Sequence, residues 1–415
     1  MNRNLKCLWT SQLLSQIADG IAKLALLWFV YSVTGSALKT TMIGLFQTVS
    51  SIVCTPFVGV LVDRLPKKMI LIVTDLLRGL FIGFVPWLLP SELLTVDVLY
   101  LLVFLYGLFS SVFTPALSAS IPFLIQAKHF TAGNAVLQST TSIGIILGPI
   151  MSGIGIAALG PQQVLSWNTL TYLASVVLLI PLRFSSDIGL IDHQRQRFMT
   201  ALVEAVRFTF TSSPAIIGVL VIAALYTFGS APLTTLMPVF GKMLFHLGPV
   251  EVGYLWSSLG VGFLLTSIGL LRVTEWSVRA RLSLIAASNV VAGLALMALL
   301  GVMTLVPAVM LMGVVGAGLG ALTPIAWGIV QEISPSSMVG RVMALYTAVA
   351  MTTSLAGIWF FGWITQSFGE PSGVLGIGVV LLLGGAASVL FKNRIGEQAS
   401  FAMEAPRRAP ASTAS

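Results

Sequence analysis

Long apolar runs separated by short polar breaks extend from the first residues of the chain to about residue 391. A helix needs about 20 mostly apolar residues to cross the hydrocarbon layer of a membrane. Because lipid offers no hydrogen-bond partner to backbone groups, runs of this length are expected to be helical. The pattern predicts twelve spans, at approximately 8–33, 41–62, 69–89, 97–121, 133–158, 165–183, 214–240, 250–271, 282–302, 305–331, 338–365 and 373–391.

The composition supports a membrane protein and excludes several other classes. Hydrophobic residues make up 56% of the 415 residues, charged residues 9%, and the mean hydropathy is +0.97. Soluble domains carry about 25% charged residues, so this chain has too little polar surface to cover a soluble core. The sequence has no phosphate-binding Gly-x4-Gly-Lys-Ser/Thr motif and no cluster of cysteine and histidine, so we expect no cofactor and no metal. The basic residues lie in short breaks, which argues against a nucleic-acid partner.

Lysine and arginine are distributed unequally between the two sides of the predicted spans. Of the 22 basic residues, 18 fall in breaks on the side of the N-terminus, only Lys39 and Lys242 fall on the other side, and Lys23 and Arg78 lie within spans. Cytoplasmic loops carry an excess of basic residues. The sequence therefore predicts a multi-pass protein of a bacterial inner membrane with both termini in the cytoplasm.

The chain divides into two halves of six spans each. The longest polar break, 185–213, separates a bundle at 1–184 from a bundle at 214–392, and the Ala-, Pro- and Ser-rich segment 393–415 is expected to be a disordered cytoplasmic tail. The break contains either a helix lying on the membrane surface or an ordinary solvated linker helix. Phe113–Ala116 and Leu322–Ile325 are similar and lie 209 residues apart, which indicates a duplicated unit. The predicted fold is an all-α membrane protein of two pseudo-symmetric six-helix bundles.

The break between the second and third spans resembles the signature loop of the major facilitator superfamily. Gly59 and Asp63 are four residues apart, and Arg64, Lys67 and Lys68 follow, with proline and lysine replacing the usual second glycine and arginine. A glycine permits close helix approach, and a carboxylate can meet a helix N-terminus or a cation across the cytoplasmic seam. The resemblance implies a conformational latch in which Asp63 is the central residue. The alternative is a merely basic inner loop.

The fifth span contains a second pattern with the spacing of that superfamily. Gly144, Gly148, Pro149 and Gly153 resemble its antiporter motif, which is typical of exporters. The proline predicts a kink and the glycines predict close packing. A generic kinked membrane helix is the alternative.

Four ionisable residues fall within the predicted spans, where each charge costs roughly 2.5–3.5 kcal/mol at mid-helix. Asp19 and Lys23 are four residues apart, so they share a helix face and could neutralise each other or face a central cavity. We expect Asp19 to carry a proton and Lys23 to assist it or to meet an anionic substrate. Asp75 and Arg78 could pair with each other, but we favour a role in bracing the latch loop.

Other residues are candidates for gating and for binding cargo. Glu332 and Arg341 flank an inner break and could form a cytoplasmic gate pair, although a solvated loop explains them nearly as well. Large aromatic residues within the spans could line a cavity for apolar cargo, although membrane aromatics more often pack or lie at the interface. These residues are Trp28, Tyr31, Tyr226, Trp256, Trp327 and Tyr346.

Together these patterns resemble the macrolide-efflux and enterobactin-exporter branch of the major facilitator superfamily. The resemblance implies alternating access and proton-coupled export of amphipathic small molecules of the drug, macrolide or siderophore class. The expected partners are a small-molecule substrate, protons and the lipid bilayer, and we expect a monomer. A lysophospholipid or metal-ion transporter without proton coupling is one alternative, and a non-transporting membrane sensor is another. No nucleophile-base arrangement suggests an enzyme.

Overall fold

The computed structural model describes residues 3–88, 96–121, 130–182, 204, 206–209, 214–272, 276–335 and 338–404, and within these ranges the regular structure is entirely helical. The first half contains α1 (Arg3–Thr34), α2 (Ala37–Arg64), α3 (Lys67–Leu88), α4 (Val96–Ser120), α5 (Phe130–Leu159) and α6 (Pro161–Leu179). The second half contains α8 (Pro214–Leu244), α9 (Pro249–Leu270), α10 (Val278–Ala298), the 3₁₀ turn η4 (Leu299–Gly301), α11 (Leu305–Gly320), α12 (Leu322–Ile333), α13 (Val339–Phe368) and α14 (Glu370–Glu404).

The helices agree with the predicted spans in number and order. Eleven segments of the described chain are long and apolar enough to cross a membrane, and α11 and α12 together form one of them, Leu305–Ile333. The remaining predicted span is α6, which is 19 residues long and packs against α1 and α3. The predicted tenth span is interrupted at Ala321 because Pro324 has no N–H to bond the carbonyl of Gly320, four residues earlier.

The two halves repeat the same turn at equivalent places. Gly160 joins α5 to α6 with φ 85°, and Gly369 joins α13 to α14 with φ 84°. These glycines are 209 residues apart, which is the offset of the sequence repeat. A side chain is strained at such an angle, so both turns favour glycine for the same reason. The backbone thus supports the internal duplication.

The prediction of disorder from residue 393 is wrong for its first part, because α14 continues to Glu404. Ile395 and Ala399, one turn apart, are buried. Gln398 accepts a hydrogen bond from the backbone N–H of Ala215 at the start of α8, at 3.2 Å. The helix continues because one face of this segment packs on the second bundle. Residues 405–415 and most of 185–213 lie outside the described residues, so the predicted boundaries of the two halves stay predictions.

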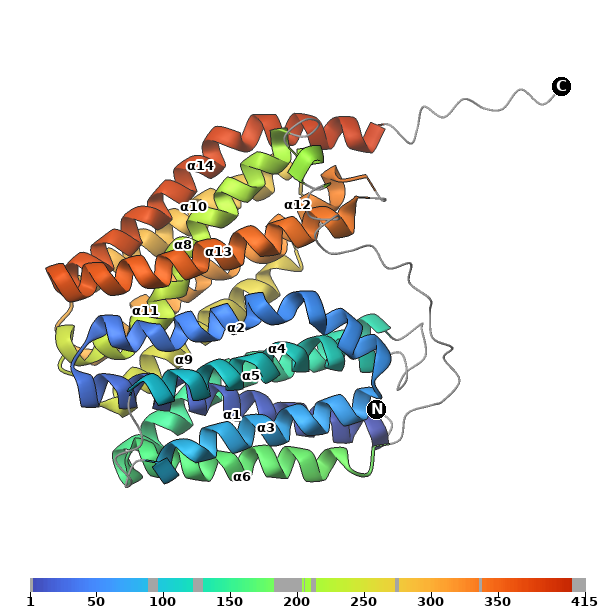
Figure 1. Cartoon of the computed structure of the whole chain (residues 1–415). Helices are drawn as coiled ribbons and strands as arrows, with labels where there is room; N and C mark the ends of the chain where they lie inside the picture. The colour runs from blue at the N-terminus through green and yellow to red at the C-terminus, as the bar shows by residue number, and fades with distance from the viewer. Residues whose placement is uncertain are drawn as a thin grey trace.

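The two bundles contact each other mainly through two pairs of helices, α5 with α9 and α2 with α13 (Figure 1). We call the end of the bundles where α1 begins and α14 finishes the terminal side, and the opposite end the far side. Cross-bundle contacts lie from mid-helix toward the far side, where Ser36 donates to the Gln366 amide oxygen at 2.8 Å. The bundles diverge toward the terminal side (Figure 1).

Candidate functional site

A stripe of polar residues follows one face of α1 toward its middle. Ser11, Ser15, Asp19 and Lys23 are each four residues apart, so they lie one above another on the helix. Of these, Ser11 and Ser15 are buried against the rest of the first bundle. The stripe brings hydroxyls, a carboxylate and an ammonium group into the interior of a membrane-spanning bundle, where each needs a partner.

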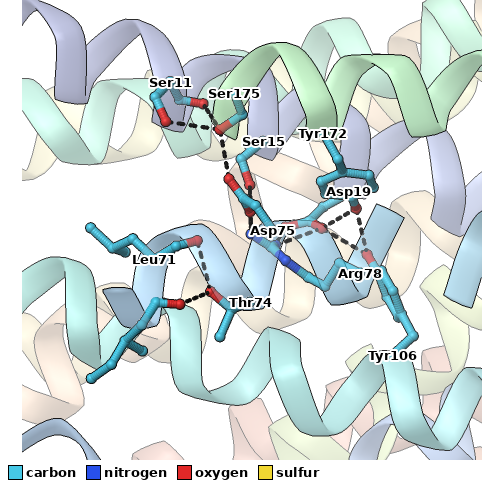
Figure 2. Close-up of polar contacts among 11 residues, drawn as sticks. Ser11, Ser15, Asp19, Leu71, Thr74, Asp75, Arg78, Tyr106, Tyr172 and Ser175 are labelled. Carbon is cyan, nitrogen blue, oxygen red and sulfur yellow. Dashed lines mark hydrogen bonds and ion pairs between the residues drawn. The ribbon is translucent and has the colours of Figure 1, made fainter. Parts of the chain in front are cut away.

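Arg78 of α3 is the centre of the charge cluster that forms around this stripe (Figure 2). Its side chain is only 1% exposed, and one guanidinium nitrogen donates to both carboxylate oxygens of Asp19, at 3.0 and 2.9 Å. The other nitrogen forms an ion pair with Asp75 and donates to Ser15 Oγ at 2.7 Å. A guanidinium suits this position because it can serve two carboxylates at once.

Hydroxyl groups from α1, α4 and α6 complete the hydrogen bonding of the two acids. Tyr106 of α4 and Tyr172 of α6 donate to Asp19 Oδ1 at 2.7 and 2.6 Å, and Figure 2 shows both phenols converging on it. Asp75 accepts from Ser15 at 3.0 Å and from Ser175 at 2.6 Å. Two carboxylates therefore share one guanidinium, which gives this group of side chains a formal charge of −1 when both acids are ionised.

These contacts decide between the alternatives for the four ionisable residues. Asp19 and Lys23 do not neutralise each other as an ion pair, because Arg78 is the ion-pair partner of Asp19, and both residues line a cavity. The interactions of Asp75 and Arg78 join α3 to α1, α4 and α6 and not to the loop at residues 65–66, so the preferred bracing role is not what the structure has. The reason is that α1 and α6 present acceptors and hydroxyls at the depth of Arg78, several turns from that loop.

The two carboxylates differ in access. The Asp19 side chain is 29% exposed, whereas that of Asp75 is fully buried. A cavity of about 170 Å³ between α1, α5 and α9 is lined by Asp19, Lys23, Pro149 and Trp256, among others. Lys23 lies over the Trp256 ring, 5.3 Å from its centroid, which is within the range of a cation–π interaction. Asp19 is thus the acid of the cluster that faces open space.

A larger cavity of about 490 Å³ lies between the two bundles. It is lined by α1, α2, α8, α12 and α13, with Lys23 from α1 and Gln47 from α2 on one wall. Trp327 and Tyr346 line the opposite wall with several threonines. Lys23 borders both cavities, so it connects the charge cluster of the first bundle to the space between the bundles.

The predicted cavity aromatics divide into two groups. Trp256, Trp327 and Tyr346 line one of the two cavities. Tyr226 is buried, and its hydroxyl donates to the carbonyl of Leu319 at 2.9 Å, so its contact is with packed backbone. The rings of Trp28 and Tyr31 lie near Lys242 of α8, with centroids 5.8 and 5.6 Å from its ammonium nitrogen, toward the far side.

The glycines of the α5 motif allow two close helix contacts. A Cβ on Gly148 would lie 2.7 Å from the Cα of Gly20, so α1 and α5 touch through backbone, and Gly144 packs against the same turn of α1. A Cβ on Gly153 would collide with the carbonyl of Pro249 at the start of α9. The motif thus determines both packing within the first bundle and the far-side seam between bundles. The helix runs unbroken through Pro149.

Replacing Gly153 with valine should loosen the far-side seam. The added side chain has no room against Pro249, and overpacking costs about 1–3 kcal/mol, enough to shift a conformational equilibrium roughly 5- to 150-fold. Spin labels on Leu159 and Met303, exposed at the far side, should report a longer inter-bundle distance. Gly269→Val is the matched control, because nothing lies within 4 Å of a Cβ there. Unchanged distances in Gly153→Val would contradict this interpretation.

The predicted latch and gate residues are placed only in part. Gly59 and Asp63 lie in the last turns of α2, but their side chains are outside the described set. Lys67 donates to the carbonyl of Val62, and Lys68 donates to the carbonyl of Ile180 at the C-terminal end of α6, where a cation is favourable.

The predicted Glu332–Arg341 gate pair is wrong. Glu332 of α12 pairs with Arg281 of α10 through two hydrogen bonds, at 2.8 and 2.5 Å. Arg341 of α13 pairs with Glu204 of the linker. The partners Arg281 and Glu204 come from segments that are distant in sequence, so the spacing of Glu332 and Arg341 along the chain could not identify them.

Sequence reasoning missed the hydroxyl partners of the acids. Tyr106, Tyr172 and Ser175 were not singled out, although Tyr172 and Ser175 are three residues apart on α6 and both are buried. A polar residue buried inside a span is itself a signal, because it needs a partner in lipid. The signal does not say which helix supplies that partner.

Comparison with known proteins gives one family match over nearly the whole chain. The profile of the family described as "Transmembrane secretion effector" matches residues 1–413. The multidrug efflux pump Tap of Mycolicibacterium fortuitum is 24% identical over 379 residues, covering 89% of this chain and 91% of the relative. The enterobactin exporter EntS of Salmonella typhimurium is 27% identical and covers 78% and 77%. The macrolide efflux protein A of Streptococcus pyogenes is 24% identical and covers 70% and 71%.

Solved structures share the fold at low sequence identity. The peptide transporter POT in complex with sulfate aligns with a TM-score of 0.75 at 13% identity, covering 96% of each chain. A bacterial homologue of the iron transporter ferroportin, in an inward-facing state, aligns with a TM-score of 0.72 at 17% identity, covering 94% of this chain and 98% of that one. At these identities the similarity shows the fold alone, and it confirms the predicted architecture of two six-helix bundles.

Proposed function

Because the chain belongs to the transmembrane secretion effector family of major facilitator transporters, we propose that it exports amphipathic small molecules across the bacterial inner membrane in exchange for protons. The relatives are efflux pumps and exporters, which supports outward transport of drug, macrolide or siderophore compounds. The single observation that carries the proton-coupled part is Asp19, a carboxylate in a buried charge cluster that also faces a cavity.

Proton binding at Asp19 gives a mechanism for coupling. A proton on this carboxylate removes its charge and weakens its attraction to Arg78, which keeps Asp75 as counter-ion. The bonds that join α1 to α3 therefore depend on protonation. Since α1 also lines the cavities, the proton alters the free-energy cost of exposing this helix to either side of the membrane.

The geometry supports a carrier open toward the cytoplasm. The cross-bundle contacts lie toward the far side and the bundles diverge toward the terminal side (Figure 1). The excess of basic residues supports a cytoplasmic location for the terminal side. In this orientation cargo enters from the cytoplasm, and opening of the Ser36–Gln366 contact would release it outside.

The terminal-side loops supply the latch of the opposite state. Asp63, with Gly59, Arg64, Lys67 and Lys68, remains the proposed latch that closes the cytoplasmic side in the outward-open state. The ion pairs Arg281–Glu332 and Arg341–Glu204 stabilise the open arrangement of the cytoplasmic side. Both sets lie at the end of the bundles that must close during export.

Transport by the wild-type protein tests the proposal directly. A panel of amphipathic compounds, including enterobactin and a macrolide, is screened for raised tolerance or release in cells that overproduce the chain. The compound selected is then followed in proteoliposomes with the membrane potential clamped. A one-unit pH gradient corresponds to about 1.4 kcal/mol and should support a roughly tenfold concentration ratio for one proton exchanged. The proposal is wrong if no compound is selected, or if the ratio stays at one and does not reverse when the gradient is reversed.

A further inference from the structure

The described residues that line the cavity between the bundles include one positively charged side chain, Lys23, which is unfavourable for cationic cargo. Taking it as the cargo site of the proposed function, we propose that it selects anionic and uncharged amphipathic compounds over cations, and that Lys23 binds the anionic or hydrogen-bond-accepting group of the cargo. This narrows the cargo class, because positively charged drugs are excluded.

Lys23 is the sole charged side chain among the described residues that line this cavity, and none of those residues is an acid. Of the acids that share Arg78, Asp75 is fully buried and Asp19 faces the smaller cavity, so neither is among the residues that line the large one. The described contact of the Lys23 ammonium is with the Trp256 ring, on the side of the smaller cavity. An ammonium group so placed attracts an anion and repels a cation, more strongly than it would in bulk water.

Several threonines that line the cavity direct their hydroxyl protons away from it, toward backbone carbonyls. Thr48 donates its hydroxyl proton to the carbonyl of Gly44 at 2.8 Å, and Thr347 donates to the carbonyl of Met343 at 2.9 Å. Thr234 and Thr235 both donate to Ala231. A hydroxyl has one proton, so these oxygens can offer the cavity only acceptor lone pairs. These four threonines therefore suit O–H or N–H donors of the cargo, while Lys23 supplies a charged donor for one acceptor group.

The membrane potential agrees with this selectivity. An inside-negative potential drives an anion outward, the direction proposed for export, and opposes the export of a cation. The cavity thus prefers anions, whose export the membrane potential favours. Asp19, which carries the proton, lies one helical turn from Lys23, so the two roles occupy different side chains.

Tetraphenylborate and tetraphenylphosphonium test the charge preference, because both are amphipathic ions with four phenyl rings and they differ in sign. Their binding to the full-length protein in detergent is followed by tryptophan fluorescence, with empty micelles subtracted. We expect the wild type to bind the borate about tenfold or more tightly than the phosphonium. Lys23→Gln should remove this preference, and Lys23→Arg should keep it.

The matched control is Lys242→Gln, because Lys242 also lies near aromatic rings but does not line the cavity. It should bind both ions like the wild type. Equal affinities in the wild type, preference for the phosphonium, or an unchanged preference in Lys23→Gln would each overturn the inference. Failure of the proposed function is separate, since it appears as loss of dependence on the proton gradient and does not alter the binding ratio of the two ions.

Discussion

Arg78→Gln is expected to destabilise the protein more than any other single change in the charge cluster. It leaves Asp19 and Asp75 without their shared cation, and Asp75 is fully buried. Removing one partner of a buried ion pair costs about 3–5 kcal/mol, because the remaining charge is left without compensation. The midpoint of thermal unfolding, measured by tryptophan fluorescence in detergent, should fall by about 3–6 °C.

Two variants separate the buried pair from charge loss in general. Arg279→Gln removes an arginine whose pair with Glu397 is 3.9 Å long and whose side chains are 51% and 64% exposed, so its cost should stay within about 1 kcal/mol. Arg78→Lys restores the charge but cannot contact both carboxylates in the same geometry, and it should fall between the wild type and Arg78→Gln. A similar midpoint for Arg78→Gln and Arg279→Gln would show that the cluster does not hold the first bundle together.

Asp19→Asn should abolish accumulation against a gradient while leaving the protein folded. Asparagine keeps a polar group near Tyr106 and Tyr172, and Arg78 retains Asp75, so the cluster changes from a formal charge of −1 to neutral and stays hydrogen-bonded. With no titratable group facing the cavity from this cluster, proton movement no longer changes the cost of exposing α1. In proteoliposomes with a one-unit pH gradient, the roughly tenfold ratio expected for the wild type should fall to about one.

The control for this variant is another acid of the same bundle. Asp97 is exposed in the first turn of α4 and lines neither cavity, so Asp97→Asn should accumulate cargo like the wild type. Downhill exchange of cargo in Asp19→Asn, measured without a pH gradient, checks that binding and conformational change persist. If Asp19→Asn accumulates cargo as the wild type does, another group carries the proton.

The sequence was sufficient for the architecture because a membrane imposes a simple rule on every span. Apolar length predicted the helices, and the equivalent turns at Gly160 and Gly369, which were not predicted, agree with the duplication that the sequence indicated. The rule does not indicate whether a helix continues into the polar segment beyond the membrane, so the extension of α14 to Glu404 was not predicted. Ile395 and Ala399, which are buried on one face of α14, have helical spacing in the sequence, but two apolar residues in a polar segment are too weak a pattern to predict a helix.

Partners in the charge cluster could not be predicted from the sequence alone. Spacing within α1 placed Asp19 and Lys23 on one face and suggested that they pair, yet Arg78, 59 residues away in the chain, binds Asp19. The reason is that spacing along the chain identifies neighbours on the same helix only. The packing of α1 against α3 and α6 determines which cation lies within ion-pair distance of the carboxylate. The pairs Glu332–Arg281 and Arg341–Glu204 followed the same principle.

The charge cluster belongs wholly to α1, α3, α4 and α6, whereas most of the hydroxyl-rich wall of the large cavity comes from α8, α12 and α13. In the proposed mechanism, proton coupling depends on the first bundle, whereas cargo recognition combines Lys23 of the first bundle with hydroxyl groups that come mostly from the second. Substitutions at Thr227, Thr234, Thr347 and Ser354 are therefore expected to change which compounds bind in the large cavity without altering the contacts of Asp19 and Arg78.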